Sequence, residues 1–177
     1  MLHFPPMPTW DSLHPLIIHF PIVLLLLTPL FVLISAVLRA PWGRPYMISA
    51  IILLVLGTGS LFIATSTGEA AAELAERGGA MDAVLQSHES LASASRMIFS
   101  GLTLLLLAIY VLPRFFGREE TRLAARYLPL AFLVLYSVGA VLIVNTAHAG
   151  GRLVHEFGVH ALISESSSDP NVPSNGE

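Results

Sequence analysis

The chain has 177 residues, of which 54% are hydrophobic and only 12% are charged, and its mean hydropathy is +0.73. Soluble domains carry roughly 25% charged residues, so the composition excludes an ordinary soluble domain, and the net charge of −3 gives no indication of a nucleic-acid partner. Cysteine is absent, which excludes disulfides, thiolate metal sites, iron–sulfur clusters and covalent attachment of a c-type haem.

Four apolar runs follow in chain order, each long enough to cross a bilayer, which takes roughly 20 residues. They predict transmembrane helices over 13–38, 46–65, 91–112 and 127–147. The first run is not typical of a cleaved signal peptide, because no basic region precedes it and its apolar stretch is too long. We therefore predict an all-α, polytopic membrane protein built as a four-helix transmembrane bundle.

The rest of the chain lies around these helices. We divide it into an outer N-terminal segment at 1–12, a membrane domain at 13–163 and a polar tail at 164–177. The tail is rich in serine and proline, so we expect it to be disordered. The connection after the second helix is acidic. There Thr67 and Gly68 suggest that one helix stops and another starts, and Glu69, Glu73 and Glu76 suggest one face of a short amphipathic helix.

The arginines predict the orientation of the bundle. Two connections on one side hold six of the nine positive residues: Arg39, Arg44, Arg114, Arg118, Arg122 and Arg126. The positive-inside rule places this side in the cytoplasm. Both termini and the acidic connection are then expected on the extracytoplasmic side.

All seven histidines fall on that outer side, although they come from different parts of the chain. His14 precedes Pro15 at the start of the first helix, a position with a sufficient structural explanation. His19 lies more than a turn deeper, beside Pro21, which predicts a kink because proline donates no hydrogen bond. His88 precedes the third predicted helix.

His148 closes the fourth helix, at the same end of the bundle. Because neutral imidazole is a good ligand of haem iron, we expect His19, His88 and His148 to be the axial ligands of a b-type haem, with His14 as a further candidate. Arg96 lies within the third helix, where a charge needs a partner. It is expected, with Arg152, to bind the haem propionates.

Two other interpretations stay open. The metal alternative is a zinc or copper site made by His14, His19, His88 and His148, joined by Glu69 or Glu89. Alternatively, the histidines are ordinary residues of helix ends near the lipid headgroups, and Arg96 extends to the interface or pairs with Glu89. No motif indicates a catalytic residue.

Three motifs, HPLIIHFP, TGEAAAE and GGRLVHEFGV, resemble the bacterial membrane family catalogued as domain of unknown function 2231, over roughly 13–159. The resemblance implies four transmembrane helices in a bacterial inner membrane. Related segments look to be fused to, or encoded beside, c-type cytochrome domains, which implies electron transfer at the outer face. The matching positions are His14, Pro15, His19, Phe20, Pro21, Gly68, Glu69, Gly150, Gly151, Leu153, Val154, Glu156, Gly158 and Val159. An aromatic residue often stands in the family where His155 stands here, so His155 is not the expected shared ligand.

The functional prediction is a membrane-embedded b-type haem protein or redox-complex subunit that passes electrons from a quinol to a periplasmic c-type cytochrome. It is expected to act as an electron-transfer or accessory subunit, within a larger membrane complex, rather than as a stand-alone enzyme. The alternatives are a non-catalytic scaffold subunit, or a zinc- or copper-binding or transport protein.

Overall fold

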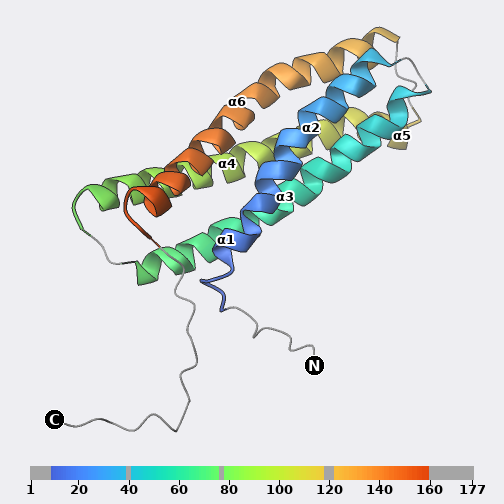
Figure 1. Cartoon of the computed structure of the whole chain (residues 1–177). Helices are drawn as coiled ribbons and strands as arrows, with labels where there is room; N and C mark the ends of the chain where they lie inside the picture. The colour runs from blue at the N-terminus through green and yellow to red at the C-terminus, as the bar shows by residue number, and fades with distance from the viewer. Residues whose placement is uncertain (1–8, 39–40, 76–77, 118–121, 160–177) are drawn as a thin grey trace, which may run out of the picture.

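The computed structural model describes residues 9–38, 41–75, 78–117 and 122–159. They form six helices and, within these ranges, no strand, which confirms the all-α prediction (Figure 1). The four long helices are α2 (His19–Val37), α3 (Gly43–Leu74), α4 (Ala80–Tyr110) and α6 (Arg122–His155), and the two short ones are α1 (His14–Ile17) and α5 (Leu112–Phe115). The predicted tail at 164–177, together with His3 and His160, lies outside the described residues.

Four spans are long and apolar enough to cross a membrane: His14–Val37, Gly43–Leu74, Ala80–Tyr110 and Tyr127–His155. A helix satisfies its backbone groups internally, which the hydrocarbon of a bilayer requires. Large apolar side chains such as Phe20, Leu104 and Val134 are exposed on the outside of the bundle. This distribution fits lipid on the outside rather than water.

Three helices extend further than their predicted bounds. The expected stop at Thr67 and Gly68 is wrong, because α3 continues through both to Leu74. The alanine-rich segment that follows has high helix propensity. With 32 residues, α3 is about 48 Å long, against a hydrocarbon core of about 30 Å. Its last turns therefore project beyond the apolar layer, as do the first turns of α4 and the last turns of α6.

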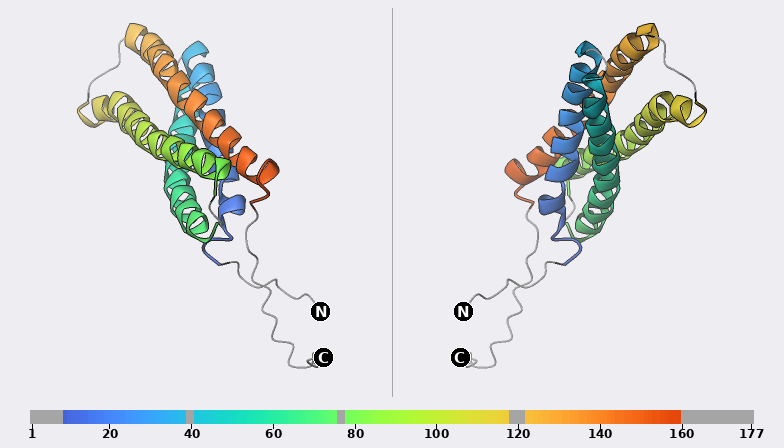
Figure 2. Two further views of the ribbon diagram at one scale, coloured as in Figure 1. Left: turned by 90° about the vertical axis from the view of Figure 1, so that its left-hand side faces the viewer. Right: turned by 90° about the vertical axis from the view of Figure 1, so that its right-hand side faces the viewer.

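The helices pack as two antiparallel hairpins, α2 with α3 and α4 with α6, and α2 also packs against α6 and α3 against α4. The two pairs cross obliquely (Figure 2). A buried core joins them along the apolar layer, including Leu25, Leu54, Phe99, Phe132 and Tyr136. Small residues allow the close approach: a Cβ at Gly139 would lie 3.1 Å from the Phe99 ring.

A proline in α2 determines one contact between the hairpins. Pro29 has no N–H, so the carbonyl of Leu25, four residues earlier, has no donor within its own helix. The hydroxyl of Tyr136 in α6 donates to this carbonyl at 2.7 Å. Tyr136 and Leu25 are both fully buried. The hydrogen bond therefore satisfies a buried acceptor that the proline leaves open.

We call the end of the bundle that carries α1, the end of α3, the start of α4 and the end of α6 the histidine end. A second apolar cluster closes it, formed by Ala72, Val84, Leu85 and Leu153. Beyond α6 the chain turns back at Gly158, whose φ is +65°. The N–H groups of Gly158 and Val159 donate to the carbonyls of Val154 and Leu153. The bond from Gly158 to Val154 is that of the αL cap, in which glycine takes the left-handed position.

Candidate functional site

A cavity of about 690 Å³ lies at the histidine end between the two hairpins. Its walls come from α1, α2, α3, α4 and α6, and they are mostly small or apolar, with Leu61, Ala92 and Ile143 among them. The volume falls in the range of small-molecule and cofactor sites, roughly 300–1,000 Å³. Three histidines belong to its lining, His14, His88 and His155, and of these His155 is exposed.

His14 is fixed against α3. Its Nδ1 lies 2.9 Å from the carbonyl oxygen of Ala64 and 3.2 Å from the Thr67 hydroxyl. A carbonyl can only accept, so Nδ1 carries the proton and donates to Ala64. The ring lies against Gly68, where a Cβ would stand only 2.8 Å from the imidazole Cε1. The other ring nitrogen, Nε2, therefore keeps its lone pair.

His88 is fixed in the same way against α6. Its Nδ1 donates to the carbonyl oxygen of Thr146 at 3.0 Å. The ring lies against Gly150, where a Cβ would stand 3.0 Å from Cε1. Thr146 is in turn held by its hydroxyl, 3.2 Å from that of Ser95 in α4. His88 therefore also has Nε2 as its unprotonated nitrogen.

The two imidazoles form a pair. Their ring centroids are 6.4 Å apart and their planes stand at 83°. This is an edge-to-face contact between one imidazole from each hairpin, at the wall of one cavity.

The sequence profile described as "Predicted membrane protein (DUF2231)" matches residues 11–162. The chain belongs to the DUF2231 family. The match confirms the resemblance drawn from the three motifs, and the four candidate spans make this DUF2231 chain a multi-pass membrane protein. No curated protein and no solved structure matches it.

Within the DUF2231 chain, the expected histidines do not all come together. His19 is exposed on the outside of α2, and His148 is exposed on α6. Neither belongs to the cavity lining, whereas His14 and His88 do. On the sequence alone, His14 is only a further candidate and His19 is preferred. Residues five apart lie about 140° apart on a helix, so the two histidines are not expected to face the same neighbour, but this spacing does not say which of them faces inward.

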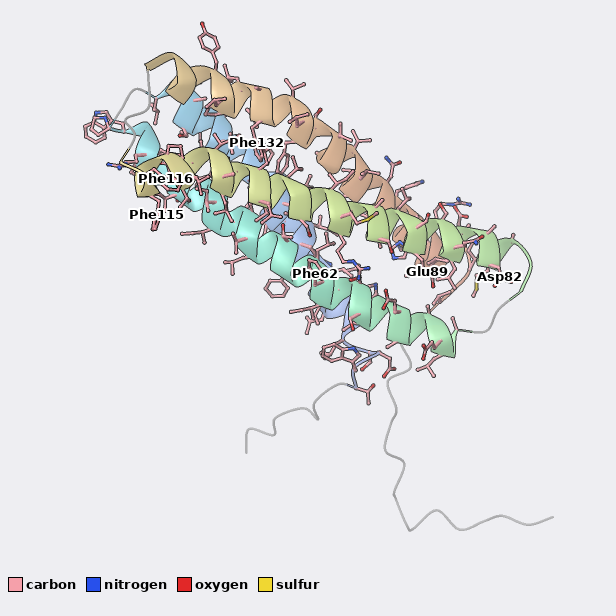
Figure 3. All side chains as sticks on the ribbon, turned by 180° about the vertical axis from the view of Figure 1, so that it is seen from behind. Phe62, Asp82, Glu89, Phe115, Phe116 and Phe132 are labelled. Carbon is pink, nitrogen blue, oxygen red and sulfur yellow. The ribbon has the colours of Figure 1, made fainter. Side chains whose placement is uncertain are left out.

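Arg96 lies in α4, about two turns from His88 toward the apolar layer, and its side chain contacts α3. Figure 3 labels Phe62 on α3 and Glu89 on α4. The Arg96 Nη1 donates to the Thr65 hydroxyl at 3.4 Å, and its guanidinium carbon lies 5.6 Å from the centre of the Phe62 ring. The described residues give it no carboxylate partner, Glu89 included. Thr65 lines the cavity, so Arg96 lies beside the wall of the candidate site.

Arg152 has another partner. It donates two hydrogen bonds to the Glu156 carboxylate from Nε and one from Nη2, and the shortest is 2.8 Å. The hydrogen bonds from Arg152 lower the pKa of Glu156, which lies just beyond the last span. Arg152 does not line the cavity. The Arg152 guanidinium is therefore already paired with a carboxylate, that of Glu156 in the turn after α6.

Four carboxylates stand at the cavity: Asp11, Glu69, Glu73 and Glu89. They do not combine with the histidines into a metal site of the usual kind. Among the described residues, no three His, Asp or Glu side chains come close enough together to hold an ion. The pair of His14 and His88 therefore supplies two protein ligands and no third.

Proposed function

We propose that this protein holds one b-type haem between His14 and His88. The observation that carries the proposal is the imidazole pair itself: two rings from different hairpins, each with Nδ1 bound to a carbonyl, 6.4 Å apart in one cavity. Histidines that ligate a metal usually donate their other N–H to such an acceptor, which fixes the tautomer and the ring orientation.

The number of protein ligands favours haem over a free zinc or copper ion. A structural zinc site takes four protein ligands and a catalytic one takes three. Haem brings its own four equatorial nitrogens and needs one or two axial ligands from the protein. His14 and His88 therefore complete the coordination of haem iron. His14 replaces His19 in the expected ligand set because only His14 faces His88.

Arg96 is the proposed partner of a haem propionate. It carries a positive charge beside Thr65 at the cavity wall, and the described residues provide no carboxylate to neutralise it. A charge within a membrane span calls for such a partner. Arg152 is less suited, because Glu156 already occupies its guanidinium at 2.8 Å.

The proposed role is electron transfer at the outer face of a bacterial inner membrane, with both termini extracytoplasmic. Four arginines support this orientation, because Arg44, Arg114, Arg122 and Arg126 lie at the end of the bundle opposite the histidine end. Haem at the histidine end would then lie close to the outer surface. A quinol in the membrane is the proposed donor and a periplasmic c-type cytochrome the proposed acceptor, with the protein acting as a subunit of a larger complex.

The test is the absorption spectrum of full-length protein, purified in detergent from haem-replete cells. We expect a Soret band and the narrow reduced α-band of low-spin b-type haem. His14→Ala and His88→Ala should each lose the low-spin spectrum, whereas the matched variants His19→Ala and His148→Ala should keep it. Folded protein without haem would refute the proposal. A spectrum lost in His19→Ala and kept in His14→Ala would refute the ligand assignment.

A further inference from the structure

The two walls of the cavity repeat one arrangement. In the first hairpin, His14 donates to the carbonyl of Ala64, and Gly68 follows four residues later in α3. In the second hairpin, His88 donates to the carbonyl of Thr146, and Gly150 follows four residues later in α6. The histidine, the carbonyl and the glycine therefore recur with the same spacing on two helix pairs that are far apart in the sequence.

Helix geometry explains why glycine follows the carbonyl by four. The Cα–Cβ bond of a helical residue tilts toward the N-terminus, so the side chain at a position lies over the preceding turn. A side chain at Gly68 or Gly150 would therefore stand where the imidazole approaches the carbonyl. The distances agree: an added Cβ would lie 2.8 Å and 3.0 Å from the two Cε1 atoms, inside ordinary van der Waals contact.

The requirement for glycine is not general along these helices. An added Cβ at Gly151, next to Gly150, would meet nothing within 4 Å. The same is true of Gly59 in α3 and Gly101 in α4. Gly57 and Gly139 do have close neighbours, but these are the apolar side chains of Leu25 and Phe99, so an imidazole is the close neighbour only at Gly68 and Gly150 among the described glycines.

We infer that Gly68 and Gly150 are positioning residues that seat the two ligand imidazoles in equivalent half-sites. The inference rests on the proposed haem ligation. Each glycine leaves its carbonyl open to an imidazole N–H besides the helical N–H, and so holds one histidine in the Nδ1–H tautomer with Nε2 free. The two hairpins thereby present the same ligand atom to one centre.

Gly68→Ala and Gly150→Ala displace one ring each. Loss of an outer-shell hydrogen bond to a metal-ligating histidine lowers metal affinity by about 10–100-fold, and we expect haem retention to fall by that factor. Part of the haem should become high-spin, because one axial bond weakens. Because the half-sites are equivalent, the two variants should behave alike, and the controls Gly59→Ala and Gly101→Ala should match wild type.

The experiment measures haem loss from the full-length protein in detergent to an excess of apo-globin, together with the spin state by resonance Raman spectroscopy. Faster haem loss and a high-spin fraction in Gly68→Ala and Gly150→Ala alone would support the inference. Wild-type rates and spectra in both variants would overturn it. Wild-type protein that binds no haem would instead overturn the proposed function, so the two failures are distinguishable.

A second measurement does not depend on haem. In the apo protein, Gly68→Ala should lower the thermal midpoint while His14 is present. In a His14→Ala background the same substitution should raise it, because alanine is the better helix former once the ring is gone. The same reversal should hold for Gly150→Ala with and without His88. A loss of stability that persists after removal of the histidine would mean that the glycine serves helix packing, and would overturn the inference.

Discussion

The hydrogen bond from Tyr136 to Leu25 allows a sharp test of how Pro29 is accommodated in α2. Tyr136→Phe removes the donor and leaves a fully buried carbonyl without its partner. An unsatisfied buried acceptor costs about 1–3 kcal/mol, and interhelical hydrogen bonds in membranes are worth about 0.6 kcal/mol on average and about 1.7 at most. We therefore expect Tyr136→Phe to lower the free energy of unfolding by about 1–2 kcal/mol.

Pro29→Ala supplies the partner needed for a double-mutant cycle. Alanine restores an N–H that can donate to the Leu25 carbonyl within α2, so the tyrosine hydroxyl becomes dispensable. In this background Tyr136→Phe should cost about 0.5 kcal/mol or less, which gives a coupling of about 1 kcal/mol. Unfolding of the four proteins in mixed detergent and dodecyl sulfate micelles measures the cycle.

The matched control is Tyr127→Phe, because Tyr127 lies in the same helix as Tyr136 but is exposed. It should leave the free energy of unfolding unchanged within about 0.5 kcal/mol. An equal loss from Tyr136→Phe with proline and with alanine at position 29 would refute the reasoning. The hydroxyl would then stabilise the protein by some means other than satisfying the carbonyl that Pro29 leaves open.

Three further predictions concern the histidine end. The planes of the His14 and His88 rings stand at 83°. With both rings bound to haem iron, the ferric protein should therefore give a strongly anisotropic low-spin electron paramagnetic resonance signal with one high-g feature. A rhombic signal would mean that the rings turn parallel. The pKa of Glu156 is lowered by Arg152, so the ion pair stabilises the protein above the ordinary glutamate pKa and is lost as pH falls through the lowered value. The thermal midpoint of Glu156→Gln should accordingly lie below wild type at pH 7 and converge with it in acid, whereas a pH-independent difference would contradict the linkage. Gly158→Ala places a side chain at φ +65° and should cost about 1–2 kcal/mol in thermal or denaturant unfolding; an unchanged stability would mean that the turn relaxes.

The membrane architecture could be read from the sequence because each span carries its own signal. About 20 apolar residues suffice to predict a helix, and the absence of water leaves no other local structure. The ends of the helices were harder to predict from the sequence. Beyond the apolar layer, Thr67 and Gly68 are typical of a helix stop, yet α3 continues through them. The His14 ring packs against Gly68, and this contact between segments more than 50 residues apart cannot be seen in a single sequence.

The topology predicted that the candidate site lies at the histidine end, but not which histidines form it. Alternating helices assign every residue to an end of the bundle, and this placed His14 and His88 at the same end. Which histidine points inward depends on the rotation of each helix about its own axis. That rotation is set by packing against the neighbouring helix, which a single sequence does not reveal. The preference for His19 over His14 rested on depth alone, and depth says nothing about direction.

The HPLIIHFP motif spans the interruption between α1 and α2. Pro21 cannot donate to the carbonyl of Ile17, and α1 ends at that residue, next to the predicted kink. Pro15 starts α1, and its preset φ suits a first helical position. Ile18, between the two helices, keeps helical dihedrals, with φ −57° and ψ −26°. Five helical steps therefore still separate His14 from His19 by about 140°, so the His14 imidazole lines the cavity while His19, the first residue of α2, is exposed on the outside.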